Sequence, residues 1–187
     1  MTTETPADRH RGIAAVFSER VHGVADWDVP TPVPEWTARD VVGHLTTWSA
    51  GFLHGVGVTL PPGPDPADDP VGAWDAHAAA IQALLDDPES AVRTIENPHM
   101  GTMELGVMVD RIYTTDIVMH TWDLARATGQ DDRLDPAVTG PLVEGMEQME
   151  EVLRSSGQFG VRVPVPDDAD AQTRLLGFIG RDPDWKP

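Results

Sequence analysis

Three ionisable side chains lie close together in the segment "DIVMHTWDLARATGQ" (residues 116–130), namely Asp116, His120 and Asp123. Asp116 and His120 are four residues apart, a spacing that brings two side chains onto the same side of an α-helix. At this spacing a carboxylate oxygen and an imidazole nitrogen can be directed at one metal ion. The same two side chains can also form a buried ion pair, so the spacing by itself leaves both interpretations open.

The periodicity of residues 102–128 predicts that these polar side chains face the protein core. An α-helix turns by about 100° per residue, which gathers apolar side chains into one stripe comprising Leu105, Met108, Val109, Ile112, Met119 and Ala127. Asp116 and Asp123 fall inside this stripe, and His120 falls at its edge. No Lys or Arg lies four residues from Asp116 on either side. Because an ionised carboxylate buried without a partner costs several kcal/mol, a cation is expected beside Asp116, and a metal ion would satisfy that need.

A third donor is available on another predicted helix. In "ARDVVGHLTTWSAGFLHGV" (38–56), His44 lies on the same helical face as Val41 and Trp48. A single inward-facing histidine is more often a hydrogen-bonded core residue than a metal ligand. Together with Asp116 and His120, however, His44 completes a set of three donors that leaves coordination positions open for water or substrate.

The other ionisable residues receive lesser roles. Asp123 is expected to support the three donors by accepting a hydrogen bond from His120, or else to cap a neighbouring loop. The remaining histidines fall in predicted terminal, surface or loop positions and are assigned no role: His10, His22, His54, His77 and His99.

The elements that position these residues are all predicted to be helices. Apolar residues recur with helical spacing in segments near residues 8–25, 38–56, 74–86, 102–128, 136–156 and 171–180. Thr37 and Asp40 resemble a capping box at the start of the second segment. "DVPTPVPEW" (28–36) and "LPPGPDPADDP" (60–70) are proline-rich, so extended connections are predicted there. No segment has the pattern of a β-sheet.

The predicted fold is therefore all-α. Four long helices form the core of a bundle, with an extra helix and an extended C-terminal tail that ends in a short helix. The length of 187 residues favours a single domain. Its bundle core is expected over residues 7–156, with the tail of residues 157–187 packed against it.

The charge and composition of the sequence argue against several classes of function. The formal net charge of −18 argues against binding to nucleic acids or to anionic membrane surfaces, which would repel the protein. The sequence has no cysteine, so the chain itself supplies no disulfide, thiolate ligand or thiol nucleophile. It has no apolar run long enough to span a membrane and no signal-peptide pattern at its N-terminus. The predicted location is therefore the cytoplasm.

Two of these segments, "WTARDVVGHL" (36–45) and "DIVMHTWDLARATGQ" (116–130), resemble the DinB-like four-helix-bundle superfamily. The closer resemblance is to its actinobacterial branch, which is related to the metal-binding domain of the mycothiol-dependent maleylpyruvate isomerase. "PTPVPEW" (30–36) and the tail "FGVRVPVPDDADAQTRLLGFIGRDPDW" (159–185) are similar to that branch as well. The resemblance therefore covers most of the chain.

This resemblance implies a divalent metal ion held by His44, Asp116 and His120. In the isomerase the middle ligand is a Glu, so Asp116 has a shorter reach here. Val33 and Glu35 stand where relatives often carry Cys and Gly, which predicts a changed entry to the site. With two imidazoles and one carboxylate as ligands, zinc and nickel are the expected metals.

The function implied by the resemblance is thiol chemistry. A thiol transferase or isomerase is expected, in which the metal binds mycothiol, lowers the pKa of its thiol and presents it to a small electrophile. The isomerase has a second, C-terminal domain that contributes to its active site, so a reaction other than maleylpyruvate isomerisation is expected.

Two other interpretations of the site stay open. One is a non-catalytic protein with a structural or regulatory ion, and the other is a metal-free bundle in which the three side chains only form hydrogen bonds. A homodimer paired through exposed apolar helix faces is compatible with any of these interpretations.

Overall fold

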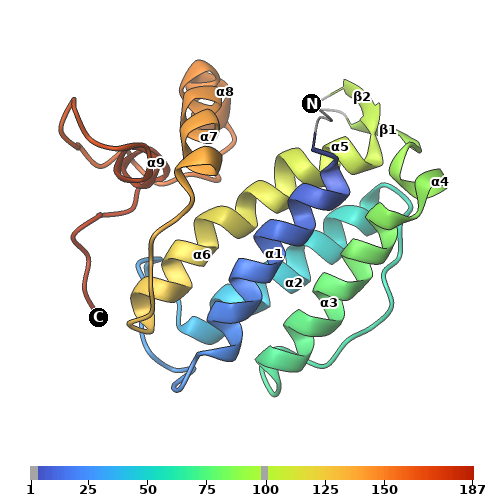
Figure 1. The fold of residues 1–187 in the computed structure, drawn as a ribbon, viewed down its shortest axis with the longest axis horizontal. Helices are drawn as coiled ribbons and strands as arrows, with labels where there is room; N and C mark the ends of the chain where they lie inside the picture. Colours follow the sequence, from blue (N-terminus) through green and yellow to red (C-terminus); the bar gives the residue numbers. More distant parts are fainter. Residues whose placement is uncertain (1–3, 98–100) are drawn as a thin grey trace.

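The structure, a computed structural model that describes residues 4–97 and 101–187, is built around a bundle of helices (Figure 1). Its members are α1 (Pro6–His22), α2 (Ala38–Gly55), α3 (Pro70–Asp86) and a composite helix made of α5 (Leu105–Val109), the π-helical segment η1 (Asp110–Thr114) and α6 (Thr115–Ala127). Both α1 and α2 pack against α3 and against α6. The bundle therefore encloses one core, and the predicted all-α fold is confirmed.

The helices begin where a side chain accepts a hydrogen bond from a free backbone N–H group of the first turn. Such acceptors precede several helices: Thr5, Asp69, Asp135 and Asp170. The predicted capping interaction of α2 is present, since the Asp40 carboxylate accepts a hydrogen bond from the backbone N–H of Thr37 at 2.8 Å. This fixed start determines where His44 lies along the bundle.

The composite helix changes its phase at η1. A π-helix forms hydrogen bonds from residue i to i+5 and so accommodates an extra residue. The predicted apolar stripe holds in α5, where Leu105, Met108 and Val109 are buried in the bundle core. After η1, however, Ile117 and Leu124 face that core, whereas Met119 packs on the other side of α6. The prediction for Met119 is wrong because a uniform step of about 100° contains no phase shift.

A short hairpin leads into the composite helix, in the order α4 (Pro88–Ala91), β1 (Thr94–Asn97) and β2 (Gly101–Glu104). The two strands are antiparallel, with Ile95 opposite Met103. The prediction that no segment forms a sheet is therefore wrong, and the helix predicted from residue 102 begins at Leu105. Each strand has one large apolar side chain, too few for an alternating pattern to be recognised in the sequence. His99, which is assigned no role, lies outside the described residues.

Three further helices form a smaller lobe beside α6 (Figure 1): α7 (Pro136–Gln148), α8 (Glu150–Ser155) and α9 (Ala171–Ile179). We call residues 136–187 the C-terminal lobe. The helix predicted over residues 136–156 is interrupted at Met149, whose φ of −112° departs from helical values. Apolar side chains of α7 and α9 form a second hydrophobic cluster with Val118, Met119 and Trp122 of α6. Since α6 has a core on both sides, it is buried along nearly its whole length.

The C-terminal lobe contains a close approach of two chain segments at Gly180. This residue ends α9 with a φ of +84°, in the left-handed region that favours glycine. A Cβ atom here would lie 2.8 Å from the Cα atom and from the carbonyl carbon of Gly160. The chain that follows α8 therefore packs directly against the end of α9.

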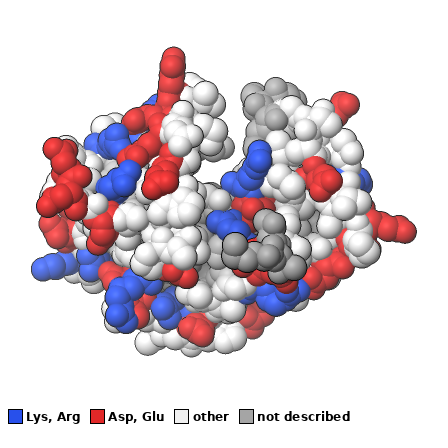
Figure 2. Space-filling model, turned by 45° about the horizontal axis from the view of Figure 1, so that its top comes forward, with Lys and Arg blue, Asp and Glu red and all other residues white. Residues whose placement is uncertain are grey.

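The surface carries charges of both signs. Figure 2 shows Asp and Glu spread over much of one face and interspersed with Lys and Arg, which is typical of a solvated acidic surface. Among the residues that the structure describes, no helix combines the length and the apolar character needed to cross a bilayer.

Two histidines that the sequence places at terminal, surface or loop positions lie instead in the bundle core. His10 is 0% exposed and His77 is 9% exposed, so the prediction for this pair is wrong. His10 Nδ1 lies 2.9 Å from Gln82 Oε1, and His77 Nε2 lies 2.8 Å from Ser49 Oγ. Burial lowers the pKa of both imidazoles, that of His77 to about 4. Both side chains are therefore neutral at pH 7.

Replacing Gly180 by Ala is expected to destabilise the protein by about 2 kcal/mol, because a residue with a Cβ atom is strained in the left-handed region and the methyl group meets Gly160. Gly12→Ala is the matched control, since a Cβ atom at Gly12 in α1 has no neighbour within 4 Å. That change should stabilise the protein by about 0.5–1 kcal/mol. Urea unfolding measures both effects, and unchanged stability of Gly180→Ala would contradict the close approach.

Acid is expected to destabilise the fold through His77. Its pKa is about 4 in the folded protein and about 6.5 in an unfolded chain. Between these values the unfolded state binds more protons, so stability falls as the pH drops from about 6.5 to about 4, by about 3 kcal/mol in total. His77→Gln keeps an N–H donor for Ser49 and should show a smaller loss when urea unfolding is repeated across this pH range. An unaltered pH dependence of stability in that variant would refute this assignment.

Candidate metal centre

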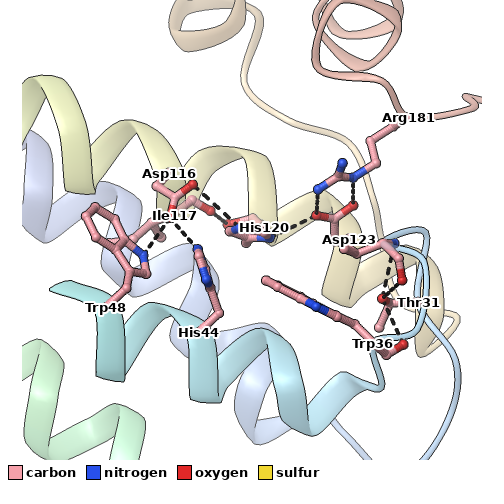
Figure 3. Close-up of polar contacts among 11 residues, drawn as sticks. Thr31, Trp36, His44, Trp48, Asp116, Ile117, His120, Asp123 and Arg181 are labelled. Atoms are coloured by element: carbon pink, nitrogen blue, oxygen red, sulfur yellow. Dashed lines mark hydrogen bonds and ion pairs between the residues drawn. The ribbon is translucent and has the colours of Figure 1, made fainter. Parts of the chain in front are cut away.

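The three predicted donors meet between α2 and α6 (Figure 3). His44 Nε2 lies 3.1 Å from Asp116 Oδ2, and His120 Nε2 lies 3.5 Å from Asp116 Oδ1. One donor atom from each of the three side chains lies within 4.8 Å of the others. The structure thus brings together side chains that come from distant parts of the sequence.

These side chains lie at the edge of the core. The side chains of His44 and Asp116 are 30% and 16% exposed, whereas that of His120 is buried. Burial opposes a charge on Asp116, but His120, His44 and the indole N–H of Trp48 outweigh it and lower the pKa of the carboxyl. Burial also opposes a charge on His120, but Asp116 and Asp123 outweigh it and raise the pKa of the imidazole. In the absence of an ion, the carboxylates and imidazoles therefore stabilise one another.

Asp123 contacts the other nitrogen of the His120 ring. Asp123 Oδ2 lies 2.9 Å from His120 Nδ1. When the proton sits on Nδ1 and is donated to Asp123, the lone pair of His120 Nε2 remains available on the side of Asp116. This hydrogen bond is the first of the two contacts expected for Asp123 from the sequence.

Arg181 of the C-terminal lobe holds the same carboxylate. Its Nε atom donates to Asp123 Oδ1 at 2.8 Å, and its Nη2 atom donates to Oδ2 at 3.1 Å (Figure 3). Burial opposes a charge on Asp123, but His120 and Arg181 outweigh it and keep the pKa of this carboxyl below its usual value. Asp123 is therefore ionised although its side chain has no exposed surface.

Two tryptophans restrict the donor side chains. The Nε1–H of Trp48 donates to Asp116 Oδ2 at 3.0 Å and so helps to orient the carboxylate. The Trp36 ring lies 4.9 Å from the His44 ring and stacks on the His120 ring at a centroid distance of 5.7 Å. Both imidazoles consequently pack against an indole, which limits their rotation.

The loop that carries Trp36 is a turn, and the extended connection predicted for residues 28–36 is incorrect at this point. The Trp36 N–H donates to Val33 O at 3.1 Å, and the Thr31 N–H donates to Trp36 O at 2.9 Å. Pro34 and Glu35 occupy the two central positions, and Glu35 has a φ of +67°. Turns with Pro second and a positive φ third usually have Gly at the third position, which agrees with the Gly expected in relatives.

The donor set fits a divalent metal ion. Two imidazole nitrogens and a carboxylate oxygen are common ligands of zinc and nickel, and the hydrogen bond to Asp123 leaves His120 Nε2 free for this purpose. Across residues 4–97 and 101–187, no second group of three His, Asp or Glu side chains has donor atoms this close together.

Sequence reasoning missed Trp36, Trp48 and Arg181 as parts of this site. Trp48 lies on the predicted face of His44, but an aromatic residue there is equally expected to fill the core. Arg181 is 58 residues from Asp123 in the sequence, so no local spacing relates the two. The one available signal was that a carboxylate predicted to be buried needs a cation.

Comparison with known proteins places these residues in a family. The model of the mycothiol maleylpyruvate isomerase N-terminal domain matches residues 10–125, a span that contains the three donors and Asp123. The chain is also similar to the uncharacterized proteins Rv0738 and MT0763 of Mycobacterium tuberculosis strains H37Rv and CDC 1551. Each is 30% identical over 154 residues, which cover 81% of this chain and 83% of the relative.

No solved structure matches the chain. The family match agrees with the sequence resemblance and covers more than half of the residues. This chain therefore belongs to the family of the mycothiol maleylpyruvate isomerase N-terminal domain.

Proposed function

We propose that this protein is an enzyme of low-molecular-weight thiol chemistry that depends on zinc or nickel held by His44, Asp116 and His120. The observation that carries the proposal is the meeting of these donors, with one atom from each within 4.8 Å of the others. Membership of a mycothiol-linked family supports mycothiol as the thiol. The reaction would be a transfer or isomerisation that begins when the thiol sulfur attacks a small electrophile.

The thiol has to come from outside the chain, since the sequence has no cysteine. A divalent ion at this site would supply a Lewis acid that lowers the pKa of a thiol bound there. The donor set contributes a single negative charge, that of Asp116, which leaves a net positive charge in the site and favours an anionic sulfur.

The surrounding side chains hold the donor side chains in fixed orientations. Trp48 orients the Asp116 carboxylate through its N–H, and Asp123 holds His120 with Nε2 available. The partial exposure of His44 means that the site opens to solvent beside this residue, where a thiol and an electrophile would approach. Trp36 stacks on the His120 ring and shields the ring face that it covers from water.

Metal analysis of protein purified without a His-tag tests the ligand set. The wild type is expected to hold about one divalent ion per chain, and His120→Ala should hold almost none, because it removes a ligand. His22→Ala is the matched control, since His22 is 54% exposed and pairs with Asp75 on the surface. This control should keep the metal. A wild type that lacks metal and cannot be loaded would sink the proposal and favour a metal-free bundle.

Cobalt-substituted protein tests the thiol step. Addition of mycothiol should produce a sulfur-to-cobalt charge-transfer absorption band, because cobalt makes a normally silent zinc-type site visible. N-acetylcysteine and electrophile panels would then define the reaction. A bound ion whose spectrum does not respond to any thiol would contradict the enzymatic proposal and favour a structural or regulatory ion.

A further inference from the structure

The C-terminal lobe reaches the candidate metal centre through one side chain. Arg181 forms two hydrogen bonds with Asp123, at 2.8 Å and 3.1 Å, and Asp123 in turn lies 2.9 Å from His120 Nδ1. Residue 181 lies beyond residues 10–125, the part of the chain that matches the family domain. The lobe therefore adds a contact that the matched domain does not contain.

Arg181 fixes the orientation of the Asp123 carboxylate. The Asp123 side chain is 0% exposed and that of Arg181 is 14% exposed, so the docked guanidinium separates this carboxylate from bulk water. A bidentate arginine fixes the plane of a carboxylate as well as neutralising its charge. With its plane fixed, Asp123 presents Oδ2 to the His120 ring (Figure 3).

The backbone around Arg181 is held in place by the lobe. The left-handed Gly180 ends α9 and redirects the chain, and the Arg181 N–H donates to Leu176 O at 2.8 Å. On the bundle side, Arg126 of α6 donates to the carbonyl oxygen of Pro183. The position of the guanidinium therefore depends on the C-terminal lobe being docked against α6.

We propose that Arg181 is a positioning residue that acts through Asp123 to hold His120 in the orientation for metal binding. This inference rests on the proposed metal site. It follows that docking of the C-terminal lobe and metal binding at His44, Asp116 and His120 favour each other, because a coupling between two binding events is reciprocal. The C-terminal lobe then contributes to metal binding by supplying Arg181.

Zinc affinity measured by competition with a chelator tests this proposal. Arg181→Ala should weaken zinc binding by about 10–100-fold, the usual effect of losing a residue that supports a metal ligand. Arg181→Lys keeps the charge but not the bidentate geometry and should fall between Arg181→Ala and the wild type. Arg133→Ala is the matched control, since Arg133 is 84% exposed and pairs with Asp131 on the surface, and it should bind zinc as the wild type does.

Two further measurements separate positioning from general stability. Nitrogen NMR of the His120 ring in metal-free protein, at a pH high enough for the ring to be neutral, should show the Nδ1–H form in the wild type and a mixture of forms in Arg181→Ala. Amide exchange at Arg181 should slow when zinc is added to the wild type, as reciprocity requires. If Arg181→Ala does not fold, Arg181→Lys carries the same comparisons.

The outcomes distinguish this proposal from the proposed function. A wild type that binds no zinc overturns the metal site and, with it, this inference. Zinc binding by the wild type with the same affinity in folded Arg181→Ala or Arg181→Lys overturns the inference alone. Weaker zinc binding in these variants with an unchanged His120 ring form would also overturn it, because Arg181 would then act on stability and not on the ligand.

Discussion

A fully buried carboxylate in the middle of α6 is the constraint on which much of this structure depends. Asp123 has no exposed side-chain surface, and leaving such a charge without a partner costs about 3–5 kcal/mol. Its own helix supplies His120 as one partner, and the other, Arg181, comes from the C-terminal lobe. The C-terminal lobe returns to α6 to supply this second partner, and α6 consequently packs against a hydrophobic cluster on each of its two sides.

Carboxylates alternate with nitrogen-bearing side chains through this region, and their contacts keep its geometry fixed. Asp116 faces His44 and His120, while Asp123 faces His120 and Arg181. An incoming ion would find its donors already turned toward one point, so little rearrangement of the helices is needed. Preorganisation of this kind raises the affinity for a ligand, because the entropy cost of ordering the side chains is met during folding and not during binding.

Local patterns in the sequence were sufficient to predict most of the helices, and together with the family resemblance they singled out His44, Asp116 and His120. The capping pair Thr37 and Asp40 defines the start of α2, and the four-residue spacing of Asp116 and His120 defines one side of α6. The hairpin, with one large apolar residue per strand, gave no periodic signal. The turn at Glu35 and the burial of His10 and His77 depend on tertiary packing, and Arg181 depends on a contact across 58 residues. These features follow from the folded chain and not from any short stretch of it.

The π-helical segment Asp110–Thr114 sets how α5 and the hairpin are oriented relative to the donor helix. Deleting one residue there would return the composite helix to regular α-helical phase, turning α5 and the hairpin by about 100° and shifting them by about 1.5 Å along the axis. Asp116, His120 and Asp123 all lie downstream, so their mutual spacing would be preserved. The same turn would carry Leu105, Met108 and Val109 out of the bundle core, so the extra residue of the π-helical segment is what allows α5 and the donor helix to face one core together.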